Sequence, residues 1–257
     1  MNIAVILKQV PDTEAVVKPD PAKPGAILET DIKFILNTYD EYAVEEAVRI
    51  VEKTGGEAVG VCIGPERAEA AIRSALAMGL SRALWVSEPD AVSADVITQA
   101  KVLAAAIKTL SPGLVLCGRE MIDTQEDAIA SAAAQFLDMP QVLNAAKITI
   151  DGEKAVVLRE VESASLEIEA KLPAVISCGK GLNEPRYPNL MSIKKAKNKE
   201  IKKLTLAELG LQAGPAKARI AALEAPAPRA KGVRVEGEVA SMVAQGVDWL
   251  MKVAKVV

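Results

Sequence analysis

Short apolar runs alternate with helical patterns along the first 140 residues of the chain. Runs typical of buried strands occur at 3–7, 57–63, 83–86 and 114–117. Apolar side chains at steps of three and four predict helices after them, at 40–53, 65–79, 93–108 and 124–137. Strands that alternate with helices indicate a parallel sheet, and right-handed crossovers place helices on both of its faces. The expected fold class is therefore α/β, with a doubly wound, mostly parallel, Rossmann-like sheet.

Cap and turn residues mark where these helices begin and end. Asp40 and Ser93 are the expected N-caps of the first and third helices, since their side chains can accept a hydrogen bond from the first turn. Pro65 suits the first position of the second helix, and Gly79 suits its end.

Beyond Pro140 the apolar positions follow the period of strands. The turn Asp-Gly-Glu-Lys at 151–154 predicts a β-hairpin. Four strands are expected around and after it, at 147–150, 155–158, 165–172 and 174–177. They form a small β extension of a domain that spans residues 1–210.

The tail has a different composition. Eight of the nineteen residues in 212–230 are Ala and three are Pro, and Ile220 and Leu223 are the only large apolar ones. This segment cannot bury a core, so an extended linker is expected. Apolar residues at helical steps then predict an amphipathic helix from Glu238 to Val257. Residues 211–257 are thus a tether with a terminal helix, which docks on the chain's own body or on a partner.

Composition excludes several classes of function. The 257 residues are half hydrophobic and carry a net charge of −3 at pH 7, so one sizeable core is expected and no general attraction to nucleic acid. The absence of histidine excludes Ser-His-Asp and Cys-His catalysis and most catalytic zinc sites. Cys62, Cys117 and Cys178 lack a metal-binding spacing, so we expect buried thiols in a reducing compartment and no metal site. No stretch resembles a membrane span or signal peptide, so a cytoplasmic protein is expected.

Three loops at the carboxyl ends of strands can meet in one crevice. They are the long segment 8–37, Gly64-Pro65 and Gly118-Arg119. Ligands of doubly wound sheets bind at such a crevice, so nucleotide binding is one interpretation. Neither G-x-G-x-x-G nor a Walker A sequence is present, and 8–37 can equally be a surface excursion fixed by its prolines.

A lysine-rich segment follows two apolar residues, Leu190 and Met191. Six lysines occur within ten residues, at Lys194, Lys195, Lys197, Lys199, Lys202 and Lys203. They are compatible with a solvated basic face, a nucleic-acid patch or a docking rim for an acidic partner, although the acidic total disfavours nucleic acid. Exposed apolar side chains beside charges are typical of a protein-docking anchor.

Four stretches resemble the β subunit of electron transfer flavoprotein. Three are Val5-Ile-Leu-Lys-Gln-Val-Pro-Asp12, Asn37-Thr-Tyr-Asp-Glu-Tyr-Ala-Val-Glu-Glu-Ala-Val48 and Ile72-Arg-Ser-Ala-Leu-Ala-Met-Gly79. The fourth resembles the family's signature segment and runs from Arg159-Glu160 through Lys171-Leu-Pro-Ala-Val175 to Leu182-Asn-Glu-Pro-Arg-Tyr187. The resemblance covers residues 1–210 nearly end to end, and the tail has the family's arm-and-helix layout.

The resemblance implies a heterodimer without catalysis by the β subunit itself. The larger α subunit carries FAD, which takes electrons from acyl-CoA-type dehydrogenases of fatty acid oxidation and passes them to a membrane quinone oxidoreductase. The β subunit is implied to hold a structural AMP in an adenine nucleotide alpha hydrolase-like fold. The implied cofactor-binding residues are Val5, Lys8, Asn37, Tyr39, Cys62, Gly64, Gly118, Asp123, Asp127, Ala128 and Ile129.

The family pattern also implies partner-binding residues, most of them in a recognition loop at 182–198. Tyr39 is implied to lie near the isoalloxazine, Glu160 to contact the swinging flavin domain, and Leu190 to anchor the dehydrogenase. The terminal helix is implied to pack on the α subunit. The implied partner-binding residues are Glu160, Arg186, Tyr187, Leu190, Met191, Lys194 and Lys195.

One segment departs from the family. Ala128-Ile129-Ala130 replaces the Gln-Thr-Gly or Gln-Val-Gly that holds the AMP phosphate, and Glu126 and Asp127 add negative charge. The helix N-terminus is then expected to be satisfied by its own carboxylates, with AMP weakly bound or absent. The alternative is a bifurcating relative with a second FAD, whose phosphate loop also needs the missing glycine. An adenylating hydrolase would need a Ser-Gly-Gly-x-Asp-Ser loop, which 8–12 does not resemble.

Overall fold

The computed structural model describes residues 1–92, 95–212, 216–229, 231–232 and 234–256. The chain divides into two compact units, Met1–Leu223 and Glu224–Val257. The first unit contains a large sheet with its covering helices, and the second contains a terminal helix.

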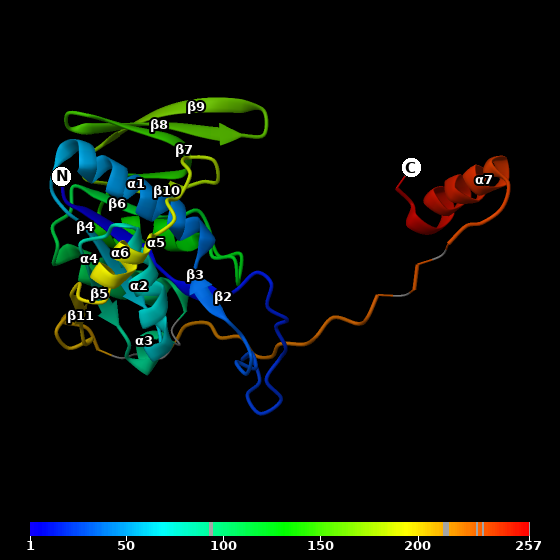
Figure 1. Ribbon diagram of the computed structural model, residues 1–257, viewed down its shortest axis with the longest axis horizontal. Coiled ribbons are helices and arrows are strands. Elements are labelled where there is room, and N and C mark those ends of the chain that lie inside the picture. The colour runs from blue at the N-terminus through cyan, green and yellow to red at the C-terminus, as the bar shows by residue number, and fades with distance from the viewer. Residues whose placement is uncertain (93–94, 213–215, 230, 233, 257) are drawn as a thin grey trace. The chain divides into compact units, whose positions relative to one another are not determined.

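Nine strands in the described part of the first unit form one sheet (Figure 1). Across the sheet their order is β11 (Ile201–Lys203), β5 (Arg82–Val86), β4 (Ala58–Ile63), β1 (Ile3–Leu7), β6 (Leu114–Gly118), β10 (Ala174–Cys178), β7 (Gln141–Asp151), β8 (Lys154–Val161) and β9 (Ala164–Lys171). Neighbours from β11 to β7 are parallel, and β8 and β9 extend the sheet antiparallel. The doubly wound, mostly parallel α/β fold is thereby confirmed.

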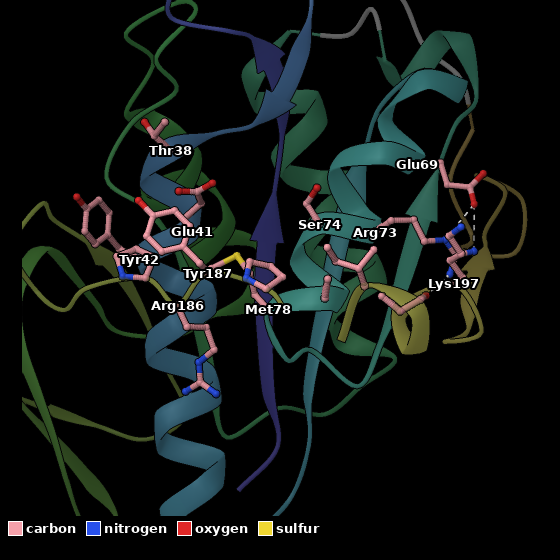
Figure 2. Close-up of a pocket in the computed structure, with 15 residues that line it drawn as sticks. Thr38, Glu41, Tyr42, Glu69, Arg73, Ser74, Met78, Arg186, Tyr187 and Lys197 are labelled. Carbon is pink, nitrogen blue, oxygen red and sulfur yellow. Dashed lines mark hydrogen bonds and ion pairs between the residues drawn. The ribbon is translucent and has the colours of Figure 1, made fainter. Parts of the chain in front are cut away.

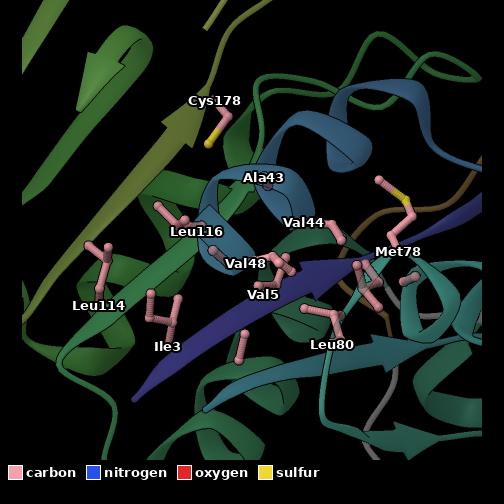
Figure 3. Packing of buried hydrophobic residues seen from close by; sticks show 14 of the residues in the cluster. Ile3, Val5, Ala43, Val44, Val48, Met78, Leu80, Leu114, Leu116 and Cys178 are labelled. Carbon is pink, nitrogen blue, oxygen red and sulfur yellow. The ribbon is translucent and has the colours of Figure 1, made fainter. Parts of the chain in front are cut away.

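Helices cover both faces of this sheet. They are α1 (Thr38–Thr54) and α2 (Glu69–Met78) on one face, and α4 (Val96–Lys108) and α5 (Ala128–Leu137) on the other. Strand β1 is buried on both sides, which is why it is a continuous apolar run. Its Val5 packs against Val44 and Val48 of α1 (Figure 3), whereas Ile6 faces α4 and α5.

Strand β10 occupies an interior position that its place in the sequence does not suggest. It lies between β6 and β7 and pairs in parallel with both, with Ala174 opposite Leu114. All five of its residues are buried. The hairpin of β8 and β9 forms one end of the sheet and β11 the other (Figure 1).

Two expected N-caps are not the residues that begin the helices. Asp40 lies inside α1, because Asn37 occupies the N-cap position. Asp95 caps α4 by accepting hydrogen bonds from the N–H groups of Ile97 and Thr98, both at 3.1 Å. Ser93, the N-cap expected for that helix, lies outside the described residues.

The starts of α2 and α5 also differ from the prediction. Pro65 precedes a 3₁₀ turn (η1, Glu66–Ala68), and α2 begins only after it. Helix α5 begins at Ala128 instead of Thr124, because 121–126 form a tight turn. In this turn the N–H of Met121 donates to the carbonyl of Glu126 at 2.8 Å.

Several short elements complete the first unit. The long segment 8–37 contains an antiparallel pair, β2 (Gln9–Pro11) and β3 (Phe34–Leu36), which the apolar pattern did not predict. Two short helices are α3 (Pro89–Val92) and α6 (Leu190–Ala196). The N–H of Lys217 donates to Asp95 at 2.7 Å, so part of the expected linker is held by the first unit.

The second unit contains α7 (Val239–Trp249), which continues as a π-helical turn, η2 (Leu250–Ala254). Its apolar side chains, including Val243 and Trp249, are exposed. The helix expected at 238–257 is thus present from Val239 to Ala254, Lys255 adopts a left-handed conformation after it, and Val257 lies outside the described residues. Within the described ranges, no helix is both long and apolar enough to cross a bilayer.

Candidate functional site

The crevice expected at the carboxyl ends of the strands exists beside β1. Strand β1 pairs with β4 on one side and β6 on the other, which makes it the point where the strand order reverses. A cleft of about 650 Å³ opens there. We call it the switch-point cleft. Three of the predicted cofactor residues line it, Lys8, Gly64 and Asp123, together with Ile220 and Leu223.

Asp40 joins three segments behind this cleft. It is fully buried, and its carboxylate accepts hydrogen bonds from the N–H of Lys8 at 2.8 Å, the N–H of Gly118 at 3.1 Å and the Asn37 amide at 2.9 Å. Burial nevertheless raises the pKa of Asp40 to about 7, because desolvation of the charged carboxylate outweighs these hydrogen bonds. Asp40 thus ties α1 to the ends of β1 and β6.

Gly118 permits the close approach of α1 to β6. A Cβ at this position would lie 2.7 Å from the Cβ of Tyr39 and would also collide with the Asp40 carboxylate. The predicted cofactor residue Gly118 is therefore required by the packing of the fold itself.

The Asn37 side chain is occupied by the protein. Its amide donates to Asp40 and to the carbonyl of Glu120 at 3.0 Å, and its oxygen accepts from the N–H of Ile122 at 3.2 Å. Asn37 therefore fixes the loop after β6 to the start of α1. Tyr39, two residues further on, is half-buried.

Both basic side chains that line the switch-point cleft are paired with carboxylates. Lys8 Nζ lies 2.9 Å from Asp123 Oδ1. Arg67 is bound by Glu29 through two contacts, at 2.7 and 3.1 Å, and lies over the Phe34 ring with its guanidinium carbon 3.8 Å from the centroid. The charged lining therefore offers a ligand no unpaired cation among the described residues.

A neighbouring carboxylate accepts one N–H at the start of α5. Glu126 Oε1 accepts a hydrogen bond from the N–H of Ala128 at 2.8 Å, as expected from the sequence. Asp127 is exposed at the N-cap position, and Ile129 is buried. The carboxylate occupies the kind of position that an anion takes at a helix N-terminus.

Two predicted cofactor residues lie in the core. Val5 and Cys62 are fully buried in the cluster between the sheet and α1. Burial raises the pKa of the Cys62 thiol to about 12 and also raises those of Cys117 and Cys178. All three cysteines are buried, as expected.

The segment before α6 is clamped onto α1. The Arg186 guanidinium contacts Glu45 at 2.8 Å and Glu52 at 2.7 Å, and the backbone N–H of Arg186 donates to Glu45 at 3.1 Å. The Asn183 amide donates to Glu46 and to the Tyr42 carbonyl, both at 3.0 Å. Arg186, a predicted partner-binding residue, thus uses its guanidinium to bind two carboxylates of its own chain.

The other end of this segment is fixed to α2. Arg73 donates to the carbonyls of Ala196 and Lys199, at 2.9 and 2.7 Å. Lys199 Nζ in turn donates to the carbonyls of Leu76 and Leu80, at 2.9 and 2.6 Å. The expected recognition loop, 182–198, is therefore held at both ends.

Apolar side chains project between these two attachments. Tyr187, Leu190 and Met191 are 98%, 78% and 64% exposed, and we call these three residues the docking crest. The Asn189 side chain accepts from the N–H of Ser192 at 2.9 Å and so fixes the start of α6. The crest is thus a set of exposed apolar groups on a fixed support.

A groove of about 890 Å³ lies beside the docking crest, between α1, α2 and 185–197. Figure 2 shows Glu41, Tyr42 and Tyr187 at one end of this groove and Arg73 and Lys197 at the other. Partial burial raises the pKa of Glu41. The Glu41 side chain has no hydrogen bond or ion pair within the described part of the chain, so it is a partly desolvated carboxylate without a partner.

The six lysines do not act as one group. Lys199 is used inside the fold, and Lys203 binds Glu66 at 3.0 Å and lies over the Trp85 ring. The remaining four are exposed: Lys194, Lys195, Lys197 and Lys202. The predicted partner residue Glu160 is also exposed, on β8 at the antiparallel end of the sheet.

Comparison with known proteins adds an independent result to this geometry. A model of the electron transfer flavoprotein domain matches residues 25–209. An electron transfer flavoprotein subunit beta of Thermoanaerobacterium thermosaccharolyticum is 40% identical over 84% of this chain and 86% of its own length. The chain belongs to the β-subunit family of electron transfer flavoproteins.

Other members of this family confirm how far the likeness extends. The subunit beta of Bacillus subtilis is 35% identical over the full length of both chains. The human subunit beta is 35% identical over 92% of this chain and 93% of its own. The resemblance seen in the sequence is therefore confirmed, and it includes the tail as well as the sheet domain.

Proposed function

We propose that this chain is the β subunit of a heterodimer that moves electrons from acyl-CoA-type dehydrogenases to a membrane quinone oxidoreductase. The electrons travel on an FAD that the α subunit mainly holds, and the flavin supplies the redox chemistry when bound. Family membership supports this proposal, and one structural observation carries it furthest. The docking crest exposes apolar side chains on a segment that ion pairs and hydrogen bonds fix at both ends.

The role of this chain in the transfer is positioning. It contains no histidine, and burial keeps its three thiols protonated at neutral pH, so it offers neither a histidine base nor a cysteine nucleophile. We propose that Tyr39 lies near the flavin ring and that Glu160 contacts the moving flavin domain. The chain itself then performs no catalysis.

Different surfaces serve different partners in this proposal. The docking crest, with Leu190 as its anchor, contacts the dehydrogenase. The exposed lysines Lys194 and Lys195 lie in the same helix and attract an acidic partner over a distance. The amphipathic helix α7 packs on the α subunit, and the complex works in the cytoplasm.

Co-expression with an α subunit of the family tests the assembly. The two chains are expected to purify as one complex with visible flavin absorbance, whereas this chain purified alone is expected to have none. Flavin that survives purification of this chain alone contradicts the proposal. A failure of the two chains to form a complex contradicts it as well.

A further inference from the structure

The switch-point cleft does not fit the phosphate of the AMP that the family implies. A phosphate at a doubly wound sheet needs free backbone N–H groups at a helix N-terminus, space for close approach and a compensating cation. The described residues of this cleft, and the start of α5 that follows its lining residues Asp123 and Thr124 in the chain, supply these requirements poorly.

The first requirement, free N–H groups, is opposed by Glu126. Its carboxylate already accepts the N–H of Ala128, which opens α5, at 2.8 Å. A phosphate at this helix end would have to displace that carboxylate. The charge of the displaced Glu126 carboxylate would then remain close to the phosphate, as would that of the exposed Asp127. Like charges at such short range oppose each other.

The second requirement fails because the approach to the helix carries side chains. Ala128, Ile129 and Ala130 stand at its first three positions, and no glycine lies in this turn. Glycine is the residue that lets a backbone approach a phosphate closely. Ile129 and Ala130 are buried against the sheet, so they cannot move aside without opening the core.

The third requirement is a free cation. Lys8 is bound by Asp123 and Arg67 by Glu29, as described above. Asp12 also lines the cleft and is paired with Lys33 at 2.9 Å, so each carboxylate of the lining already has a cationic partner. The lining therefore offers an anion no free positive charge among the described residues.

We infer that Glu126 takes the place of the nucleotide phosphate and that this β subunit carries no anionic nucleotide. The same arrangement opposes the pyrophosphate of a second FAD, so the heterodimer holds a single flavin and no adenylate. This inference rests on the proposed function, because it concerns the cofactor content of that complex. The cleft that remains can take only a neutral or cationic group.

The cofactor content of the wild-type heterodimer is the primary test. The purified complex is denatured, and the released flavin and adenylate are quantified by liquid chromatography and mass spectrometry. One flavin and no stoichiometric AMP are expected. One AMP per complex, or two flavins, overturns the inference while leaving the proposed function intact. A complex without flavin refutes the proposed function instead.

Charge removal at the helix N-terminus provides the second test. The heterodimer with Glu126→Ala and Asp127→Asn is titrated with AMP by calorimetry, beside the wild type. A matched control, Asp151→Asn with Glu153→Gln, removes two exposed charges at the β7–β8 turn. AMP is expected to bind the first variant about tenfold more tightly than the wild type, through the loss of two repulsive charges, and the control no more tightly.

Equal AMP affinity of the wild type and the Glu126 variant contradicts the inference. If that variant does not fold, the stoichiometry of the wild-type complex still decides. A third variant restores the family's residues with Ala128→Gln, Ile129→Thr and Ala130→Gly beside the two charge substitutions. It is expected to bind AMP more tightly again, and loss of binding relative to the charge variant contradicts the assignment of this turn.

Discussion

The substitution Leu190→Ala separates docking from every other property of the complex. Leu190 is 78% exposed in the chain, so its removal costs little packing. Burying a whole leucine side chain contributes roughly 1.5 to 3 kcal/mol. Since about three quarters of this side chain is still exposed, the dehydrogenase pocket can add roughly 1.2 to 2.3 kcal/mol. That range corresponds to a roughly sevenfold to fortyfold loss of affinity.

The assay is anaerobic reduction of the heterodimer flavin by an acyl-CoA dehydrogenase and its substrate, below saturation. The rate is expected to fall by the factor given above, while flavin content, thermal unfolding and reduction by dithionite stay unchanged. Leu28→Ala is a control, because Leu28 is another exposed leucine, at 37%, and belongs to the long segment 8–37 instead of α6. A wild-type rate for Leu190→Ala refutes its role as the anchor. An equal loss in the Leu28 control shows that the effect is not specific to the crest.

Four further predictions concern the stability of the sheet domain and the assembly of the heterodimer. Arg186→Ala leaves the buried Glu45 with Arg49 alone, so the free energy of unfolding is expected to fall by about 1 to 3 kcal/mol in urea titration; no loss refutes the clamp. Gly118→Ala is expected to lower the free energy of unfolding by about 1 to 3 kcal/mol through overpacking against α1, and an unchanged free energy contradicts the close approach. Asp40 binds a proton more readily in the folded than in the unfolded chain, between its ordinary pKa of 3.8 and about 7, so stability falls as pH rises through this range. Asp40→Asn cannot ionise and is expected to flatten that slope when unfolding is measured at about pH 5 and about pH 8; an unchanged slope contradicts the assignment. Deleting residues 224–257 is expected to weaken assembly with the α subunit and to leave the circular dichroism of the sheet domain intact, and unchanged assembly shows that α7 does not bind that subunit.

The sequence predicted the parts of the fold that depend on local patterns. Strand β1 and its parallel neighbours are continuous apolar runs because both faces are covered, and the helices between them show one apolar face. The interior place of β10 could not be predicted, because strand order is set by pairing between distant segments. The prediction that Asp40 is the N-cap of α1 was wrong, because the Asp40 side chain binds the ends of β1 and β6 instead of the first turn of its own helix.

Side-chain roles were harder to predict than elements, for the same reason. Arg186 and Lys199 have the composition of an exposed basic surface, yet their partners lie more than a hundred residues away in the sequence. Glu45 and Glu52 are separated by seven residues on α1, so they lie on the same face, a spacing that could have indicated a shared partner. In contrast, Glu126 bonds two residues ahead, and its contact with the start of α5 was predicted correctly.

The most direct test of the central claim is electron transfer that requires both subunits. The complex of this chain with its α subunit is mixed anaerobically with an acyl-CoA dehydrogenase and acyl-CoA, and flavin absorbance is followed in a stopped-flow instrument. Rapid loss of flavin absorbance is expected in the complete mixture, and none when either the dehydrogenase or the acyl-CoA is omitted. A complex whose flavin no acyl-CoA dehydrogenase reduces, although dithionite does, would contradict that claim.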